Sequence, residues 1–293
     1  MDRYRKVIQE SNVPVDRDFI RKELDKITEK IPELRNTDVY TRIFSCIDLT
    51  TLNTTDSQNS VTGFIQRVND FDNEYPQYPN VAAVCVFSNF AGVVRSALEV
   101  TGVKTAVVAG GFPSGQTFTE VKVADVALAV SEGADEVDVV MNLGMLRDGN
   151  YEEHCDELIE VKHAAKDAHM KVIIESGALR EPEQIRDASI LAMYSEADFV
   201  KTSTGKVYEG ATPEAAYVMC QCIKEYHEKT GRKVGFKAAG GVRSSEDALI
   251  YYAIVKEVLG EEWLNNSLFR IGASSLANAI LAEMLDEAEV KYF

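Results

Sequence analysis

The sequence predicts an α/β protein built on a closed (β/α)8 (TIM) barrel with an N-terminal helical extension. Eight short apolar runs rich in β-branched residues are spread along the chain, segments with helical periodicity alternate with them, and no Pro/Gly/Ser-rich linker divides the chain. Eight β-then-α units in about 250 residues are the number that closes such a barrel. An open, doubly wound sheet is the alternative, because six strands and a miscounted pair would give a similar pattern.

The strands are expected where the residues are continuously apolar. Strands buried on both faces have such runs, whereas a sheet with one wet face alternates apolar and polar residues. The eight expected strands are residues 44–48, 81–87, 105–109, 136–141, 171–175, 199–202, 234–238 and 269–273.

The helices are expected between these runs, where apolar residues recur at i, i+3, i+4 and i+7. Four such patterns begin at Val61, Phe90, Ala216 and Ala248. Two helix starts carry signals of their own. Thr212 before Pro213 has the pattern of an N-cap followed by the first helical residue. Residues 244–247, Ser-Ser-Glu-Asp, resemble a capping box.

The first 40 residues precede the first expected strand. Ile20, Leu24, Ile27 and Ile31 form an apolar stripe there. The stripe predicts an added helix that either covers the barrel or contacts another subunit. We therefore divide the chain into an extension, residues 1–40, and a barrel domain, residues 41–293.

The charge balance limits the classes of partner. Lys plus Arg number 31 and Asp plus Glu number 47, which gives a formal net charge of −16. An acidic surface argues against non-specific binding of nucleic acids or anionic membranes, yet it permits a small basic pocket for an anionic metabolite.

The sequence also indicates a compartment. Its start has no apolar core of a signal peptide, and no apolar run of 18 residues predicts a membrane span. The five cysteines are odd in number and irregular in spacing, so they form no disulfide framework. We expect a cytoplasmic protein.

Two lysines interrupt expected strands at a place where barrels carry their reactive groups, the C-terminal strand ends. Lys201 lies in one strand, and Lys237 lies at the matching place in the next. Lys201 is either the ion-pair partner of a carboxylate or an amine whose lowered pKa lets it attack a carbonyl group. Two inward-facing ammonium groups repel each other, so one should lose its proton more easily, which favours the nucleophile.

Two carboxylates accompany these lysines. Asp138 lies within the apolar run 136–141. It neutralises a lysine, relays a proton to a substrate hydroxyl and to the carbon being deprotonated, or does both. Asp48 ends the first expected strand, where it either binds a sugar hydroxyl or caps the next segment.

Cys85 lies within an apolar run, where a cysteine is usually a small hydrophobic residue. None of the four histidines is expected in a strand, so we expect neither a Cys–His nucleophile nor a histidine metal site. No grouping of His, Asp and Glu suggests a divalent metal. These histidines, all in helix-like regions, are His154, His163, His169 and His227.

Three loops of small residues follow the last three expected strands. They contain Gly205-Lys206, residues 240–243 (Gly-Gly-Val-Arg) and residues 272–275 (Gly-Ala-Ser-Ser). Each alone could be a tight turn. Together they favour an anion site, because glycines let backbone N–H groups approach an anion and barrels often hold phosphate after strands seven and eight.

Taken together, these motifs resemble those of the deoxyribose-phosphate aldolases, from about residue 44 to residue 281. The motifs are Asp-Leu-Thr-Thr-Leu at 48–52, Glu-Val-Asp-Val-Val at 136–140, Lys-Val-Ile-Ile-Glu at 171–175, Lys-Thr-Ser-Thr-Gly-Lys at 201–206, Gly-Phe-Lys at 235–237, Gly-Gly-Val-Arg at 240–243 and Gly-Ala-Ser-Ser at 272–275.

The resemblance implies a metal-independent class I aldolase without a cofactor. Such an enzyme reversibly cleaves 2-deoxy-D-ribose 5-phosphate to D-glyceraldehyde 3-phosphate and acetaldehyde in deoxyribose phosphate catabolism. It implies that Lys201 forms the Schiff base, Lys237 perturbs it and Asp138 relays protons. The implied substrate-binding residues are Asp48, Thr50, Cys85, Lys171 and Thr204. The implied phosphate-binding residues are Gly205, Lys206, Gly240, Gly241, Val242, Arg243, Gly272, Ser274 and Ser275.

Two departures from the family pattern stand out. Ala238 replaces a proline that often follows the second lysine, and the chain ends in Lys-Tyr-Phe, whereas bacterial members end in a tail whose terminal tyrosine reaches the site. The sequence does not assign that role to Tyr292. The expected partners are small sugar phosphates and aldehydes, together with a second copy of the chain in a homodimer. Another Schiff-base sugar-phosphate enzyme and a non-catalytic sugar-phosphate-binding barrel remain alternatives.

Overall fold

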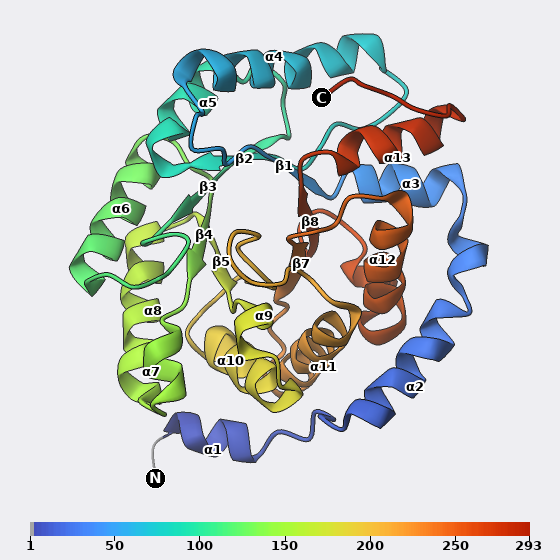
Figure 1. Ribbon diagram of the computed structural model, residues 1–293. Helices are drawn as coiled ribbons and strands as arrows, with labels where there is room; N and C mark the ends of the chain where they lie inside the picture. The colour runs from blue at the N-terminus through green and yellow to red at the C-terminus, as the bar shows by residue number, and fades with distance from the viewer. Residues whose placement is uncertain (1–2) are drawn as a thin grey trace.

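Eight parallel strands close into a barrel in which each strand pairs with the next along the chain and β8 pairs with β1 (Figure 1). The computed structural model describes residues 3–293. The expected (β/α)8 barrel is confirmed, and the open-sheet alternative is wrong because the first and last strands are hydrogen-bonded to each other. The strands are β1 Ile47–Thr50, β2 Ala83–Phe87, β3 Lys104–Ala109, β4 Glu136–Val140, β5 His169–Ile173, β6 Phe199–Lys201, β7 Gly235–Ala239 and β8 Phe269–Ala273.

The helices form the outer ring of the barrel (Figure 1). They are α1 Arg3–Gln9, α2 Arg17–Thr28, α3 Thr37–Phe44, α4 Gln58–Glu74, α5 Ala91–Ala97, α6 Thr119–Ser131, α7 Leu143–Arg147, α8 Tyr151–Ala165, α9 Ser176–Leu179, α10 Pro182–Tyr194, α11 Pro213–Thr230, α12 Ser245–Leu259 and α13 Leu276–Leu285. Short 3-10 helices cover Ile31–Leu34, Ser88–Phe90 and Glu261–Trp263. None of the helices formed by residues 3–293 is both long and apolar enough to cross a membrane.

Both predicted helix starts are confirmed. The Thr212 side chain accepts a hydrogen bond from the Ala215 backbone N–H at the start of α11. Ser244 and Asp247 form a reciprocal capping box at the start of α12. These caps satisfy backbone N–H groups that have no partner inside the first helical turn.

Two sequence expectations need correction. The first strand begins at Ile47 and not at residue 44, because Phe44 ends α3 and is buried there. His169 does not lie in a helix, because it is the exposed first residue of β5.

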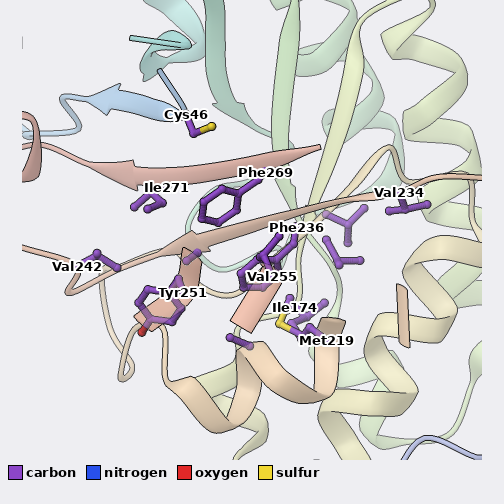
Figure 2. Packing of buried hydrophobic residues seen from close by; sticks show 14 of the residues in the cluster. Cys46, Ile174, Met219, Val234, Phe236, Val242, Tyr251, Val255, Phe269 and Ile271 are labelled. Atoms are coloured by element: carbon purple, nitrogen blue, oxygen red, sulfur yellow. The ribbon is translucent and has the colours of Figure 1, made fainter. Parts of the chain in front are cut away.

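Outward-facing strand residues pack against the ring of helices. Figure 2 shows Phe236 of β7 beside Phe269 of β8, whose rings are stacked with centroids 6.5 Å apart, and Val255 of α12 lies nearby. Lys237 follows Phe236 in β7, and Arg270 follows Phe269 in β8. Successive side chains of a strand point to opposite faces, so Lys237 and Arg270 point into the barrel interior.

The barrel interior has two different halves. On β2 and β3 the inward residues are small and apolar, and they form a cluster of Ala83, Cys85, Ala106 and Val108. On β1 and β4–β8 the interior holds charged side chains that are almost wholly buried. The division places the buried charges on one side of the barrel interior.

The N-terminal extension wraps around the outside of the barrel (Figure 1). Helix α1 contacts α8 and α10, and α2 contacts α11 and α12. Ile20 on α2 is fully buried, so its stripe lies against the barrel's own helices. The division predicted between residues 40 and 41 falls inside α3, which packs on α13.

Candidate active site

The inward faces of β4, β6 and β7 bring Asp138, Lys201 and Lys237 together. Lys201 and Lys237 occupy paired positions on neighbouring strands, as the sequence predicts. Both amines donate to the same oxygen, Asp138 Oδ2, at 2.8 Å from Lys201 Nζ and 2.7 Å from Lys237 Nζ. The two ammonium positions are thus held close by one shared carboxylate oxygen.

Further ion pairs extend this cluster across the barrel. Lys237 Nζ also donates to Asp48 Oδ2 at 2.5 Å. Lys171 Nζ donates to Asp138 Oδ1 at 2.9 Å and to Glu136 Oε2 at 2.5 Å.

Arg270 of β8 closes the network on the side of β1. Its guanidinium donates to Asp48 Oδ1 at 2.6 Å and to both oxygens of Glu136, at 2.7 and 2.9 Å. The contact with Glu136 is bidentate, which is the strong geometry for a guanidinium and a carboxylate.

The cluster holds more cations than carboxylates. Its carboxylates are Asp48, Glu136 and Asp138, and its cations are Lys171, Lys201, Lys237 and Arg270. Burying an excess charge costs free energy, and a buried group relieves that cost by losing or gaining a proton. One lysine of this cluster is therefore favoured to become neutral.

The amine that deprotonates most readily is that of Lys201. Burial lowers the pKa of Lys201, and the Lys237 cation lowers it further, while Asp138 opposes both. For Lys237, burial is outweighed by Asp138 and Asp48, so its pKa is raised. The difference follows from the partners, because Lys201 contacts one carboxylate and Lys237 contacts two.

The sequence predicts that repulsion by Lys237 keeps Lys201 neutral. In the structure, burial is the larger cause of the lowered pKa of Lys201, and the Lys237 cation is the smaller cause. Asp138 itself stays ionised: burial would raise its pKa, but Lys171, Lys201 and Lys237 hold it well below the usual range.

A cavity of about 600 Å³ opens above Lys201 at the C-terminal ends of the strands. Thr50 and Thr204 line it, together with Lys201 and all nine residues predicted for the phosphate end. The other predicted residues are buried in the barrel interior and are not part of the lining. These are Asp48, Cys85, Asp138, Lys171 and Lys237.

The loops at the predicted phosphate end pack closely because glycines lie where they touch. Gly205 and Gly240 have φ of +73° and +85°, which favour glycine. A Cβ on Gly240 would lie 2.9 Å from the Cα of Gly210 and 3.2 Å from that of Gly205. The same end receives the start of α12, just after Arg243, and the start of α13, just after Ser275, and helix N-termini attract anions.

The surroundings of Asp48 and Cys85 bear on the roles that the sequence left open for them. Asp48 does not cap the following helix, because Ser57 caps α4 and both Asp48 oxygens bind cations. Cys85 packs in the small apolar cluster, and burial raises the pKa of its thiol.

Tyr292 does not line the cavity. Its hydroxyl donates to the Arg67 carbonyl oxygen at 3.0 Å, and its ring packs against Phe71 and Tyr75. Phe293 lines the cavity instead. Within residues 3–293, no group of three or more His, Cys, Asp and Glu side chains is arranged to hold a metal ion.

The comparisons with known proteins agree with this geometry. The sequence pattern of the DeoC/LacD family aldolases matches residues 43–279. This chain belongs to that family. The deoxyribose-phosphate aldolase of Homo sapiens is 38% identical over 256 residues, which cover 84% of this chain and 80% of that protein. That of Bos taurus is 37% identical over 259 residues, covering 85% and 81%. The solved structure of the aldolase QR15 is 28% identical, with a TM-score of 0.68 over 83% of this chain and 98% of that one.

For this family member, sequence reasoning missed two parts of the site. Glu136 and Arg270 are charged residues inside apolar runs, the same signal that singled out the lysines, yet they received no role. Further residues that line the cavity lie outside the quoted motifs and received no role either. They are Asn53, Phe64, Arg67, Ala239, Asn278 and Phe293.

Proposed function

We propose that this protein is a 2-deoxy-D-ribose 5-phosphate aldolase that cleaves its substrate to D-glyceraldehyde 3-phosphate and acetaldehyde through a Schiff base on Lys201. One observation carries the proposal. Lys201 is the cluster's lysine with a lowered pKa, and its amine meets a cavity whose other end is built from glycine and serine loops. A neutral amine and an anion site are what Schiff-base chemistry on a sugar phosphate needs.

The first half of the reaction makes the electron sink. The neutral Lys201 amine attacks the C1 aldehyde of the open-chain substrate, and the carbinolamine loses water to give an iminium ion. The phosphate end anchors the substrate, so C1 is held beside the amine, which is a proximity contribution.

The second half breaks the carbon–carbon bond. Asp138 and a water remove the proton of the C3 hydroxyl, the electrons of the C2–C3 bond move into the iminium, and D-glyceraldehyde 3-phosphate leaves. The remaining enamine is protonated at C2. Water then hydrolyses the iminium, which releases acetaldehyde and restores Lys201.

Trapping the Schiff base tests the proposal. Incubation with deoxyribose 5-phosphate and borohydride should yield a covalent adduct that mass spectrometry locates on the Lys201 peptide. The variant Lys201→Leu should give neither adduct nor turnover, whereas Lys166→Leu, at the opposite end of the barrel, should give both. An adduct on another lysine, or full activity without Lys201, would overturn the proposal.

The same assay separates the alternatives. Another Schiff-base aldolase would cleave fructose 1,6-bisphosphate in preference, and a binding protein would take up the sugar phosphate without any adduct. We also propose that the reaction needs no metal, so that rates with and without EDTA should be equal. A rate that EDTA abolishes and zinc restores would contradict the Schiff-base scheme.

The proposed setting is the cytoplasm, with the protein as a homodimer. All five cysteines lie within residues 3–293, where they are buried and form no disulfide, which suits a reducing compartment. Light scattering on the purified protein tests the dimer, and a monomeric mass would contradict it.

A further inference from the structure

We propose that Glu175 is a positioning residue that takes the hydrogen of the Thr204 hydroxyl. Toward the substrate, Thr204 can then only accept a hydrogen bond, and its partner is a substrate hydroxyl. The inference rests on the proposed aldolase function, which brings a polyhydroxylated substrate into the cavity that Thr204 lines. Neither the family motifs nor the mechanism above gives Glu175 a role.

Glu175 uses both carboxylate oxygens on a single residue. Its Oε1 accepts from the Thr204 backbone N–H at 3.1 Å, and its Oε2 accepts from Thr204 Oγ1 at 2.6 Å. Glu175 is only 3% exposed, so water does not compete for these bonds. Carboxylate oxygens offer lone pairs, so Thr204 supplies the hydrogen in both of these bonds.

The remaining capacity of the Thr204 hydroxyl follows from counting. A hydroxyl has one hydrogen and two lone pairs. The hydrogen goes to Glu175, and one lone pair accepts from the Lys206 backbone N–H at 3.2 Å. One lone pair is left over, on a residue that borders the cavity. It suits an O–H group of the substrate and disfavours a carbonyl or phosphate oxygen.

The backbone of Glu175 has a conformation that a residue with a side chain rarely adopts. Its φ of +51° and ψ of +59° are left-handed, a conformation that costs free energy for any residue with a Cβ and that glycine would adopt freely. Strained residues of this kind cluster at functional sites. The strain indicates that the carboxylate, and not the turn alone, is what this position needs.

The strand ladder enforces that conformation. Beyond the ends of β5 and β6, Ile174 N–H donates to Lys201 O at 3.0 Å and Ser176 N–H donates to Thr202 O at 2.9 Å. Glu175 lies between these two bonds, so its side chain is held opposite the loop that carries Thr204. The same ladder links Glu175 to the strand that carries Lys201.

Glu175→Gln is the direct test. An amide keeps the size of the side chain, but one end of it donates. When its oxygen accepts from the Thr204 N–H, its NH2 group faces Thr204 Oγ1, reverses that bond and turns the threonine hydrogen toward the cavity. We expect kcat/KM for deoxyribose 5-phosphate cleavage to fall roughly tenfold to a hundredfold, the usual effect of leaving a buried polar group without its hydrogen-bond partner.

A double-mutant cycle separates positioning from a general structural role. Thr204→Val removes the hydroxyl and keeps the backbone N–H. If Glu175 acts through that hydroxyl, adding Glu175→Gln to Thr204→Val should cost nothing further, since coupled residues are not additive. Multiplicative losses, or a wild-type rate in Glu175→Gln alone, would overturn the inference.

Two controls complete the experiment. Glu183→Gln, an exposed position on α10, should keep the wild-type rate. If Glu175→Gln does not fold, Glu175→Gly accepts the left-handed backbone and should show the same dependence on Thr204. Absence of cleavage by the wild-type protein would overturn the proposed function and this inference with it, whereas wild-type cleavage with no Glu175 effect would overturn the inference alone.

Discussion

Lys201 and Lys237 are both buried, so the opposite shifts of their pKa values follow from the number of carboxylates that each contacts. Lys237 and Lys171 each have at least two carboxylate partners, whereas Lys201 shares one oxygen of Asp138 with Lys237. An amine in a buried site with an excess of positive charge and one shared partner is the easiest to deprotonate. The absence of a second carboxylate partner thus favours Lys201 as the nucleophile of the proposed reaction.

This account predicts a pH shift in the variant Lys237→Met. The Lys237 cation lowers the pKa of Lys201, and it also takes a share of Asp138 Oδ2. Removing it should raise the pKa of Lys201, so borohydride trapping should require a higher pH than in the wild type. The rate of adduct formation against pH checks this, with Lys166→Met as the control. If the pH midpoint of adduct formation were unchanged or lower in Lys237→Met, Lys237 would not be lowering the pKa of Lys201.

The lowered pKa of Lys201 also predicts that this lysine destabilises the folded protein at neutral pH. The pKa of Lys201 lies below its ordinary value of 10.5, so between the two values the folded chain binds fewer protons than the unfolded chain and stability rises with pH. At every pH below 10.5 this lowered pKa costs stability, either through a buried ammonium or through the proton that the amine has given up. Lys201→Met should therefore raise the free energy of unfolding at neutral pH by about 1 kcal/mol, while abolishing activity.

Urea unfolding at several pH values measures this prediction. The gain from Lys201→Met should shrink as pH rises toward 10.5, the ordinary value of a lysine. Lys237→Met is the matched comparison and should lose stability, because it leaves Asp48 and Asp138 each with one cation fewer. A destabilised Lys201→Met protein at neutral pH would contradict the excess of positive charge.

At this scale the sequence identified the charged residues but not their relations. Lys201, Lys237 and Asp138 stood out as charges inside apolar runs. Which lysine has the lowered pKa depends on contacts such as that of Lys237 with Asp48, which are 189 positions apart. Periodicity carries no information about such pairs, and the left-handed backbone of Glu175 has no sequence signal at all.

At the scale of elements, the proposed phosphate end includes two loops that touch through backbone atoms. Gly210, in the segment after β6, lies against Gly240, in the segment after β7, and Ala211 N–H donates to Gly240 O at 3.0 Å. Close approach of this kind leaves no room for a Cβ. The two loops therefore hold each other in position at the proposed anion site.

Gly210→Ala should push these loops apart. A Cβ at Gly210 would overlap the backbone of Gly240, so we expect KM for deoxyribose 5-phosphate to rise roughly tenfold or more, because small misplacements weaken anchoring strongly. The ratio of kcat/KM for deoxyribose 5-phosphate to that for unphosphorylated deoxyribose should fall with it. An unchanged ratio would show that the contact does not serve phosphate binding.

Gly63→Ala is the matched control. Gly63 lies within α4, and a Cβ there would meet no atom within 4 Å. The substitution should leave KM unchanged and add up to about 1 kcal/mol of stability, because alanine favours a helix interior over glycine.

The elements themselves were largely predictable, with errors at their ends. Continuous apolar runs identified all eight strands, because strands buried on both faces leave that pattern. The first strand was placed too early, since Phe44 is equally apolar on the buried face of α3. The short helices α7 and α9 went unpredicted, because helices of five and four residues are held by their surroundings and show no period of their own.

At the scale of the whole molecule, the extension and the barrel share contacts from end to end. Ser11 Oγ and the Asn12 N–H donate to the carboxylate of Glu225 on α11, at 2.8 and 2.7 Å. Lys229, on the same helix, donates to Glu10 O at 3.1 Å. The segment between α1 and α2 is thus fastened to the outer ring of helices by polar bonds, and α2 by apolar packing.

Ile20→Ala tests whether the extension folds as one unit with the barrel. Ile20 is fully buried between α2 and the barrel helices, so its truncation should cost about 2–5 kcal/mol, the usual range for a buried isoleucine. Because one core is shared, heat should still unfold the protein in a single transition at a lower temperature. Phe19→Ala, at a neighbouring position that is 44% exposed, should change stability by no more than about 0.5 kcal/mol. Two separate transitions in Ile20→Ala, or a barrel that unfolds at the wild-type temperature, would show that the extension is a separate unit and that the barrel does not depend on it.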